Sequence, residues 1–149
     1  PTMPLDILSV FSNDNSVVVF DVGGDDDGAL ALGQYKQYFD KYGYEMHFIV
    51  NTKRPLTRTN DELIEIAERI ESASRLKFTD IYNNTNLSDQ TDETTLFSGY
   101  DEIKMLSKKM GIVIKKNCGI DKALSNVPTN LKDTVFRMNI CILRPWEIQ

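Results

Sequence analysis

The stretch VVVFDVGGDDDGALALG, residues 17–33, has the pattern on which the expected fold class rests. Three Val and one Phe lead into Asp21, and Gly23 and Gly24 then precede an acidic run that starts at Asp25. An apolar run without alternation is typical of a strand in a parallel sheet that helices cover on both faces. The Gly and Asp residues after it are typical of a turn into a helix. We therefore expect a strand over residues 16–22.

The rest of the chain repeats this alternation of short apolar runs and helical patterns. Further strands are expected over residues 45–51, 78–84, 111–117 and 139–145. Helices are expected over residues 4–11, 27–42, 59–76, 100–110 and 121–125. Thr59 and Glu62 have the spacing of a capping box at the start of one helix. Strands that alternate with helices predict an α/β fold, a three-layer α/β/α arrangement with a mostly parallel sheet.

Composition narrows the class of protein. The 149 residues fit a single domain over residues 1–149, with 41% hydrophobic and 26% charged residues. The net charge of −5 gives no indication of direct nucleic-acid binding. No apolar run approaches the roughly 20 residues that cross a bilayer, so no membrane partner is expected. Cys118 and Cys141 have no metal-site spacing, and without an export signal we expect reduced thiols and a cytoplasmic protein.

His47 is the one histidine, and it lies inside the apolar run MHFIV. A metal site needs other ligands near the histidine, and an apolar strand pattern does not by itself supply them. We therefore expect His47 to be a packed or partly exposed side chain.

Polar residues follow the end of each expected strand. They are Asp21, Gly23 and Gly24 after the first, residues 51–55 after the second, 83–86 after the third and 115–117 after the fourth. In an open α/β sheet, ligands bind beyond the carboxyl ends of the strands. The sequence therefore predicts a binding site at this edge.

Three of these segments together resemble a known family. VVVFDVGGDDDGA, FIVNTKRPLT and IYNNTNL occur in the order of the later two-thirds of a P-loop ATPase of the ParA/MinD/CobQ group. More narrowly, they resemble bacterial ATP-binding proteins of that group from Firmicutes and their mobile elements. The resemblance implies that the chain is the C-terminal part of a nucleotide-binding ATPase domain. It also implies ATP and Mg²⁺ as cofactors of the intact protein.

The resemblance assigns roles to particular residues. Asp21 matches the acidic residue that holds Mg²⁺ through water, a catalytic and metal position. Gly23, Gly24 and Asp25 match the turn where the backbone approaches the terminal phosphate. Asn83 or Asn84, with a preference for Asn84, matches an amide that reads the purine through its donor and its acceptor. Arg54 would contact a phosphate or a partner subunit.

One family motif is missing from the sequence. The phosphate loop G-x-x-x-x-G-K-[ST] does not occur, and the chain contains no Gly-Lys pair. Because the chain opens with Pro-Thr-Met-Pro, we expect a processed or cut piece that lacks an upstream segment. The 149 residues alone are therefore expected to bind ATP weakly and not to hydrolyse it.

Each of these residues also has a purely structural interpretation. The acids at 25–27 also favour the positive end of the following helix, and the two glycines also suit a tight turn. Arg54 also fits a surface position, and Asn83 and Asn84 also fit an Asx turn. Lys115 and Lys116 are best explained as a solvated strand end.

Two other functions remain open at this point. One is a non-catalytic interaction module on the same scaffold, whose exposed sheet edge favours self-association and a homodimer. The other is a receiver-like phosphoacceptor domain, which ranks lower because the strand at 78–84 ends in Asn83 and Asn84, with no acceptor Asp. The polar segment 83–95 is expected to be mobile or shaped by a ligand.

Overall fold

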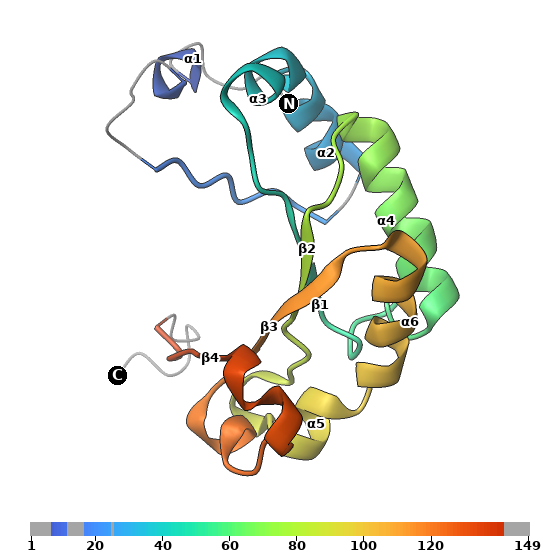
Figure 1. Ribbon diagram of the computed structural model, residues 1–149, viewed down its shortest axis with the longest axis vertical. Coiled ribbons are helices and arrows are strands. Elements are labelled where there is room, and N and C mark those ends of the chain that lie inside the picture. The colour runs from blue at the N-terminus through green and yellow to red at the C-terminus, as the bar shows by residue number, and fades with distance from the viewer. Residues whose placement is uncertain (1–6, 12–16, 25, 142–149) are drawn as a thin grey trace, which may run out of the picture.

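The computed structural model describes residues 7–11, 17–24 and 26–141 (Figure 1). Its helices are α1 (Ile7–Val10), α2 (Asp26–Gly33), α3 (Lys36–Tyr42), α4 (Asn60–Ser74), α5 (Glu93–Phe97) and α6 (Tyr100–Met110). Its strands are β1 (His47–Val50), β2 (Asp80–Asn83), β3 (Val113–Gly119) and β4 (Val135–Arg137). Three short 3₁₀ helices complete the described elements: η1 (Ser88–Gln90), η2 (Asp121–Leu124) and η3 (Thr129–Thr134).

The four strands form one sheet in the order β1-β2-β3-β4, and every neighbouring pair is parallel. His47 lies opposite Asp80, and Val50 lies opposite Asn83. The register between β2 and β3 shifts at Ile81/Tyr82. The carboxyl ends of the strands therefore meet at one edge, which we call the carboxyl rim. This arrangement confirms the predicted α/β class and is consistent with a three-layer fold.

The two faces of the sheet have different surroundings. Helices α4 and α6 cover one face of the sheet, which we call the inner face (Figure 1). Phe48, Val50 and Ile81 lie on this face, because they share a buried cluster with residues of α4 and α6. Side chains alternate along a strand, so His47, Ile49, Asp80 and Tyr82 lie on the opposite, outer face. Ile49 is 54% exposed there, whereas Ile81 on the inner face is 0% exposed.

Helix α4 begins with the predicted capping box. The side-chain oxygen of Thr59 accepts from the amide of Glu62, and the carboxylate of Glu62 accepts from the amide of Thr59 at 2.9 Å. The backbone amides of Thr59 and Arg58 both donate to this carboxylate and lower the pKa of Glu62. Leu63, Ala67 and Ile70 follow on the buried side of the helix and reach the core between α4 and the sheet.

The strand predicted over residues 16–22 is absent from the described residues 17–22, so this prediction is wrong. Residues 17–23 form neither helix nor strand, and Val17 and Val19 are 94% and 86% exposed. Phe20 and Val22 instead pack in a second cluster with α2 and α3. An apolar run becomes a strand only when a neighbouring strand supplies hydrogen bonds. Within the described chain, β1 is an edge strand that pairs only with β2, and residues 17–22 form no ladder with its free edge.

Two further elements differ from expectation. The predicted helix over residues 27–42 is two helices, α2 and α3, which separate at Gln34 and Tyr35. The predicted strand over residues 139–145 is not present at 139–141, and its remaining residues lie outside the described chain. The last described strand is β4, because Val135–Arg137 pairs with Asn117–Gly119. The helix predicted over residues 4–11 is present as α1 at Ile7–Val10, and its residues 4–6 lie outside the described chain. The other predicted strands and helices are confirmed, with η2 in place of a helix at 121–125.

None of the helices in the described residues combines the length and apolar character that crossing a membrane requires.

Candidate functional site

The carboxyl rim holds a network of amide and hydroxyl groups between β1 and β2. The side chain of Asn51, directly after β1, donates to the carbonyl of Asn86 at 3.1 Å and accepts from the amide of Asn86 at 3.2 Å. The backbone amide of Thr52 donates to the hydroxyl of Thr85 at 3.2 Å. These bonds bring together two of the segments that the sequence placed at this edge, residues 51–54 and 83–86.

Asn83 is fully buried within this network. Its amide group donates to the carbonyl of Leu96 at 3.1 Å and to the side-chain oxygen of Asn117 at 3.0 Å. Its own side-chain oxygen accepts from the amide of Thr85 at 3.1 Å. Both donors and the acceptor of Asn83 are therefore engaged within the protein. This side chain connects β2 to β3 and to the end of α5.

Asn84 differs from its neighbour. Its backbone amide donates to the carbonyl of Val50 at 2.8 Å, so it extends the ladder by one residue and its side chain projects toward the outer face. Its side-chain oxygen Oδ1 is buried and has no hydrogen-bond partner. Buried polar groups in proteins are almost always paired, because an unpaired one costs about 1–3 kcal/mol. Among the buried side-chain polar atoms of the described residues, the Oδ1 atom of Asn84 is therefore the one whose hydrogen-bonding capacity the protein leaves unused.

The neighbours of Asn84 follow from the register. Asn51 continues β1 beside it, and Cys118 lies beside it on β3. Cys118 is 6% exposed, and burial raises the pKa of its thiol to about 11. On this side of the carboxyl rim, the free acceptor therefore has neutral neighbours in Asn51 and Cys118, and the charge of Lys116 acts on Cys118 from β3.

Among the other predicted site residues that the structure describes, Arg54 lies near this rim and the rest do not. Arg54 occupies the exposed turn after β1, where its backbone amide donates to the carbonyl of Asn51. Asp21, Gly23 and Gly24 lie exposed in the irregular segment 17–24. The residues on either side of Asp21 pack with Tyr44 and Met46, which precede β1, so this segment lies toward the amino ends of the strands. Asp25 lies outside the described residues.

The polar segment after β2 is shaped by its own hydrogen bonds. The hydroxyl of Thr91 donates to the carbonyl of Ser88 at 2.6 Å and accepts from the amide of Leu87 at 2.9 Å. The carboxylate of Asp92 caps α5 and accepts from the amide and the hydroxyl of Thr95, both at 2.7 Å. These bonds lower the pKa of Asp92 to about 2. The sequence interpretation considered only mobility or a ligand, whereas local side-chain contacts also determine this loop.

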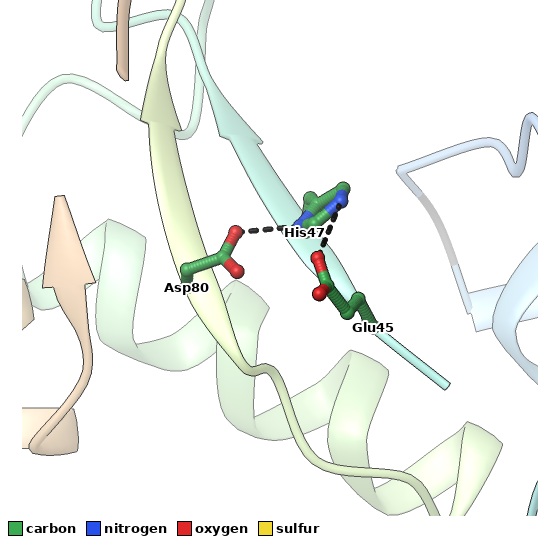
Figure 2. Close-up of side chains that lie close together, drawn as sticks. All are labelled: Glu45, His47 and Asp80. Carbon is green, nitrogen blue, oxygen red and sulfur yellow. Dashed lines mark hydrogen bonds and ion pairs between the residues drawn. The ribbon is translucent and has the colours of Figure 1, made fainter. Parts of the chain in front are cut away.

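A second polar cluster lies on the outer face at the amino ends of β1 and β2 (Figure 2). The Nδ1 atom of His47 is 2.5 Å from Oδ1 of Asp80, and its Nε2 atom is 3.7 Å from Oε2 of Glu45. Lys115 of β3 places its ammonium 2.7 Å from Glu45 and 3.2 Å from Asp80. Hydrogen bonds to these carboxylates raise the pKa of Lys115 well above its usual value.

The sequence analysis missed this second cluster. His47 was expected to lack ligands nearby, yet Asp80, 33 residues later in the chain, is its partner on the neighbouring strand. The only signal was the presence of polar residues at the starts of two apolar runs. Their proximity depends on the pairing register of β1 and β2, which the sequence does not reveal.

Comparisons of the chain with protein-family models, with curated proteins and with solved structures found no match.

Proposed function

We propose that the chain is the later part of a nucleotide-binding domain of the ParA/MinD type, and that the carboxyl rim around Asn84 receives the adenine base. The proposal is consistent with the all-parallel sheet, because ligands of such sheets bind beyond the carboxyl ends of the strands. It also places the base beside Asn51 and Cys118, two neutral neighbours of the free acceptor of Asn84.

The observation that carries the proposal is the buried, unpaired Oδ1 of Asn84. The exocyclic amino group of adenine is a donor, and an adjacent ring nitrogen is an acceptor. A rotatable side-chain amide complements both of these groups. Binding of the base would supply the hydrogen bond that Oδ1 lacks, so the cost of leaving that oxygen unpaired would be recovered on binding.

Asn83 is not assigned to the base. Its donors and its acceptor are bound to Leu96, Asn117 and Thr85. Contact with a ligand would require these buried bonds to break, which disfavours it. The proposal therefore keeps Asn84 as the base-reading residue.

Phosphate and Mg²⁺ binding would involve a different part of the chain from base binding. Asp21 remains the predicted Mg²⁺ position of the ATPase, with Gly23 and Gly24 beside the terminal phosphate. That role needs residues 17–22 as a paired strand and a phosphate loop, and the 149 residues contain no such loop motif. We therefore assign base binding to this chain and expect ATP hydrolysis only where a phosphate loop is supplied.

Adenosine is the appropriate probe, because it lacks the phosphates. We expect the 149-residue chain to bind adenosine in a calorimetric titration, and Asn84→Ala to weaken binding about tenfold. N6,N6-dimethyladenosine, which has no donor on its amino group, should bind the unaltered chain as weakly as adenosine binds the variant. Asn130→Ala, at an exposed position of η3, is the matched control and should bind normally.

Equal binding of adenosine and its dimethyl derivative would contradict the proposal. So would normal adenosine binding by Asn84→Ala.

A non-catalytic interaction module is the second candidate, favoured by one observation. Ile49, Val113 and Phe136 are 54%, 66% and 52% exposed, and the register places all three on the outer face. Large exposed apolar side chains on one face are typical of protein interaction sites. Sedimentation would distinguish this candidate, because self-association through the outer face requires a mass that rises with concentration.

A further inference from the structure

The cluster of Glu45, His47 and Asp80 is independent of the carboxyl rim, since it lies at the opposite ends of β1 and β2 (Figure 2). Each of the three residues offers one ligand atom, and these atoms all lie within 4.8 Å of one another. His47 and Asp80 occupy paired positions of neighbouring strands, so their separation is determined by the sheet. The cluster thus combines two residues held by the backbone with one on an irregular segment.

The donor set suits a first-row divalent transition ion. One imidazole nitrogen and two carboxylate oxygens are ligands that Zn²⁺ accepts, with water in a fourth position. Bond lengths near 2.1 Å in a tetrahedral site require ligand atoms about 3.4 Å apart. The side chain of Glu45 is 65% exposed and lies outside any helix or strand, so it can rotate toward His47 once its contact with Lys115 is released. The contact between Nδ1 of His47 and Oδ1 of Asp80 is 2.5 Å long and needs to lengthen only slightly to admit the ion.

The surroundings hold this donor set in place. The side chain of Asp80 is only 6% exposed, and its Oδ2 atom accepts from the hydroxyl of Thr79 at 3.1 Å. The ring of Tyr82 lies 4.8 Å from the ring of His47 and limits its movement. Groups that contact the ligands from behind orient them and raise metal affinity.

A cation already lies between the two carboxylates. The ammonium of Lys115 contacts both Glu45 and Asp80, and its side chain is 38% exposed. Two negative charges against one ammonium leave the cluster with an excess negative charge. A divalent ion would neutralise this charge more fully, and the long side chain of Lys115 is able to swing into solvent.

We propose that Glu45, His47 and Asp80 form a binding site for a divalent transition ion of the Zn²⁺ class, and that Lys115 is its built-in competitor. In the proposed site the metal lies between the imidazole and the two carboxylates. It replaces the hydrogen bond between His47 and Asp80 and the contacts of the Lys115 ammonium with Glu45 and Asp80. At low metal concentration the ammonium of Lys115 keeps its contacts with Glu45 and Asp80 and occupies the place of the ion. The site joins Glu45, two residues before β1, to His47 and Asp80, the first residues of β1 and β2.

A zinc titration of the 149-residue chain by calorimetry tests this site. All proteins carry Cys141→Ser, because the exposed thiol of Cys141 is a competing zinc ligand. His47→Gln should weaken zinc binding at least tenfold, because it removes the only imidazole. Lys115→Met should strengthen binding roughly tenfold, because it removes the competing positive charge. Lys36→Met, which removes an ammonium that pairs with Asp40 on α3, is the matched control and should bind like the parent.

A second measurement does not depend on the folding of any variant. The chain has one histidine, so its imidazole gives a single set of ring signals in nuclear magnetic resonance spectra. Zinc should shift these signals in the parent protein, whereas Mg²⁺, which prefers oxygen ligands and retains its water, should leave them unchanged.

Three results would each overturn the site: zinc affinity that is equal in the parent and His47→Gln, affinity that is unchanged in Lys115→Met, or imidazole signals that zinc does not move.

Discussion

The inner and outer faces of the sheet are built from alternate residues of the same strands, yet they have opposite properties. Phe48, Val50 and Ile81 on the inner face are buried against α4 and α6. His47, Ile49 and Lys115 on the outer face are half-buried or exposed. Alternation along a strand produces this division, since each residue turns its side chain to the side opposite to its neighbour's.

The contrast between the two faces assigns them different roles: the inner face stabilises the fold, and the outer face carries the candidate binding sites. Burial of apolar surface stabilises the fold, and nearly all of the large buried side chains of the sheet lie on the inner face. The unpaired oxygen of Asn84 and the ion cluster around His47 both lie on the outer face. We therefore expect inner-face substitutions to reduce stability and outer-face substitutions to change ligand binding.

The largest expected effect is on the free energy of unfolding at two isoleucines that lie on opposite faces of neighbouring strands, β1 and β2. Ile81→Ala should lower it by about 2–5 kcal/mol, because it leaves a cavity in a closely packed core. Ile49→Ala on the neighbouring strand should change it by less than about 1 kcal/mol, because Ile49 is 54% exposed. Urea unfolding followed by circular dichroism measures both. Similar losses at the two positions would show that the outer face is also covered in solution.

Two adjacent asparagines at the carboxyl rim, Asn83 and Asn84, should differ in how much their substitution changes the free energy of unfolding. Asn83→Ala should lower the free energy of unfolding by about 1–3 kcal/mol, because it leaves buried partners on Leu96, Asn117 and Thr85 without their bonds. Asn84→Ala should leave stability unchanged or raise it, because it removes an acceptor that has no partner. The same unfolding experiment measures both, and a larger loss at Asn84 would contradict the assignment of a free acceptor.

The smallest expected effect concerns Asp92, which caps α5 beside the rim. Its pKa is lowered to about 2, so its ionised form contributes stability above the ordinary Asp pKa near 3.9 and loses that contribution as the pH falls toward 2. Asp92→Ala should therefore lower the melting temperature at pH 7, and the difference from the parent should shrink between about pH 4 and pH 2.

Asp92→Asn is the control for this pH dependence. It retains a side-chain acceptor for Thr95 without a titrating group, so it should lose less stability than Asp92→Ala at pH 7. A difference between parent and Asp92→Ala that stays constant from pH 7 to pH 2 would show that ionisation of Asp92 does not matter.

Features that depend on neighbouring residues were predictable from the sequence. Thr59 and Glu62 form the expected capping box because both partners lie within one helical turn. The runs at 45–51 and 78–84 became β1 and β2 because each found a parallel neighbour. The run at 17–22 is equally apolar, but it has no such neighbour within the described residues and forms no strand. Local composition does not determine pairing.

The candidate sites were predictable only in part, for the same reason. The sequence placed Asn83 and Asn84 together at a strand end, but only the packing of β3 and α5 shows that Asn83 is engaged and Asn84 is free. The approach of Asp80 to His47 depends on the register between two strands 33 residues apart in the chain. Spacing along a chain does not reveal contacts of this kind.

The most direct test of the outer face as the binding face is a map of adenosine contacts by nuclear magnetic resonance of the uniformly ¹⁵N-labelled chain. Adenosine should shift the amide signals of Asn51, Asn84 and Cys118. It should leave the signals of Phe48 and Ile81 on the inner face unmoved. Asn84→Ala should abolish the shifts. Shifts that centre on other parts of the chain, or that persist in Asn84→Ala, would contradict the proposal.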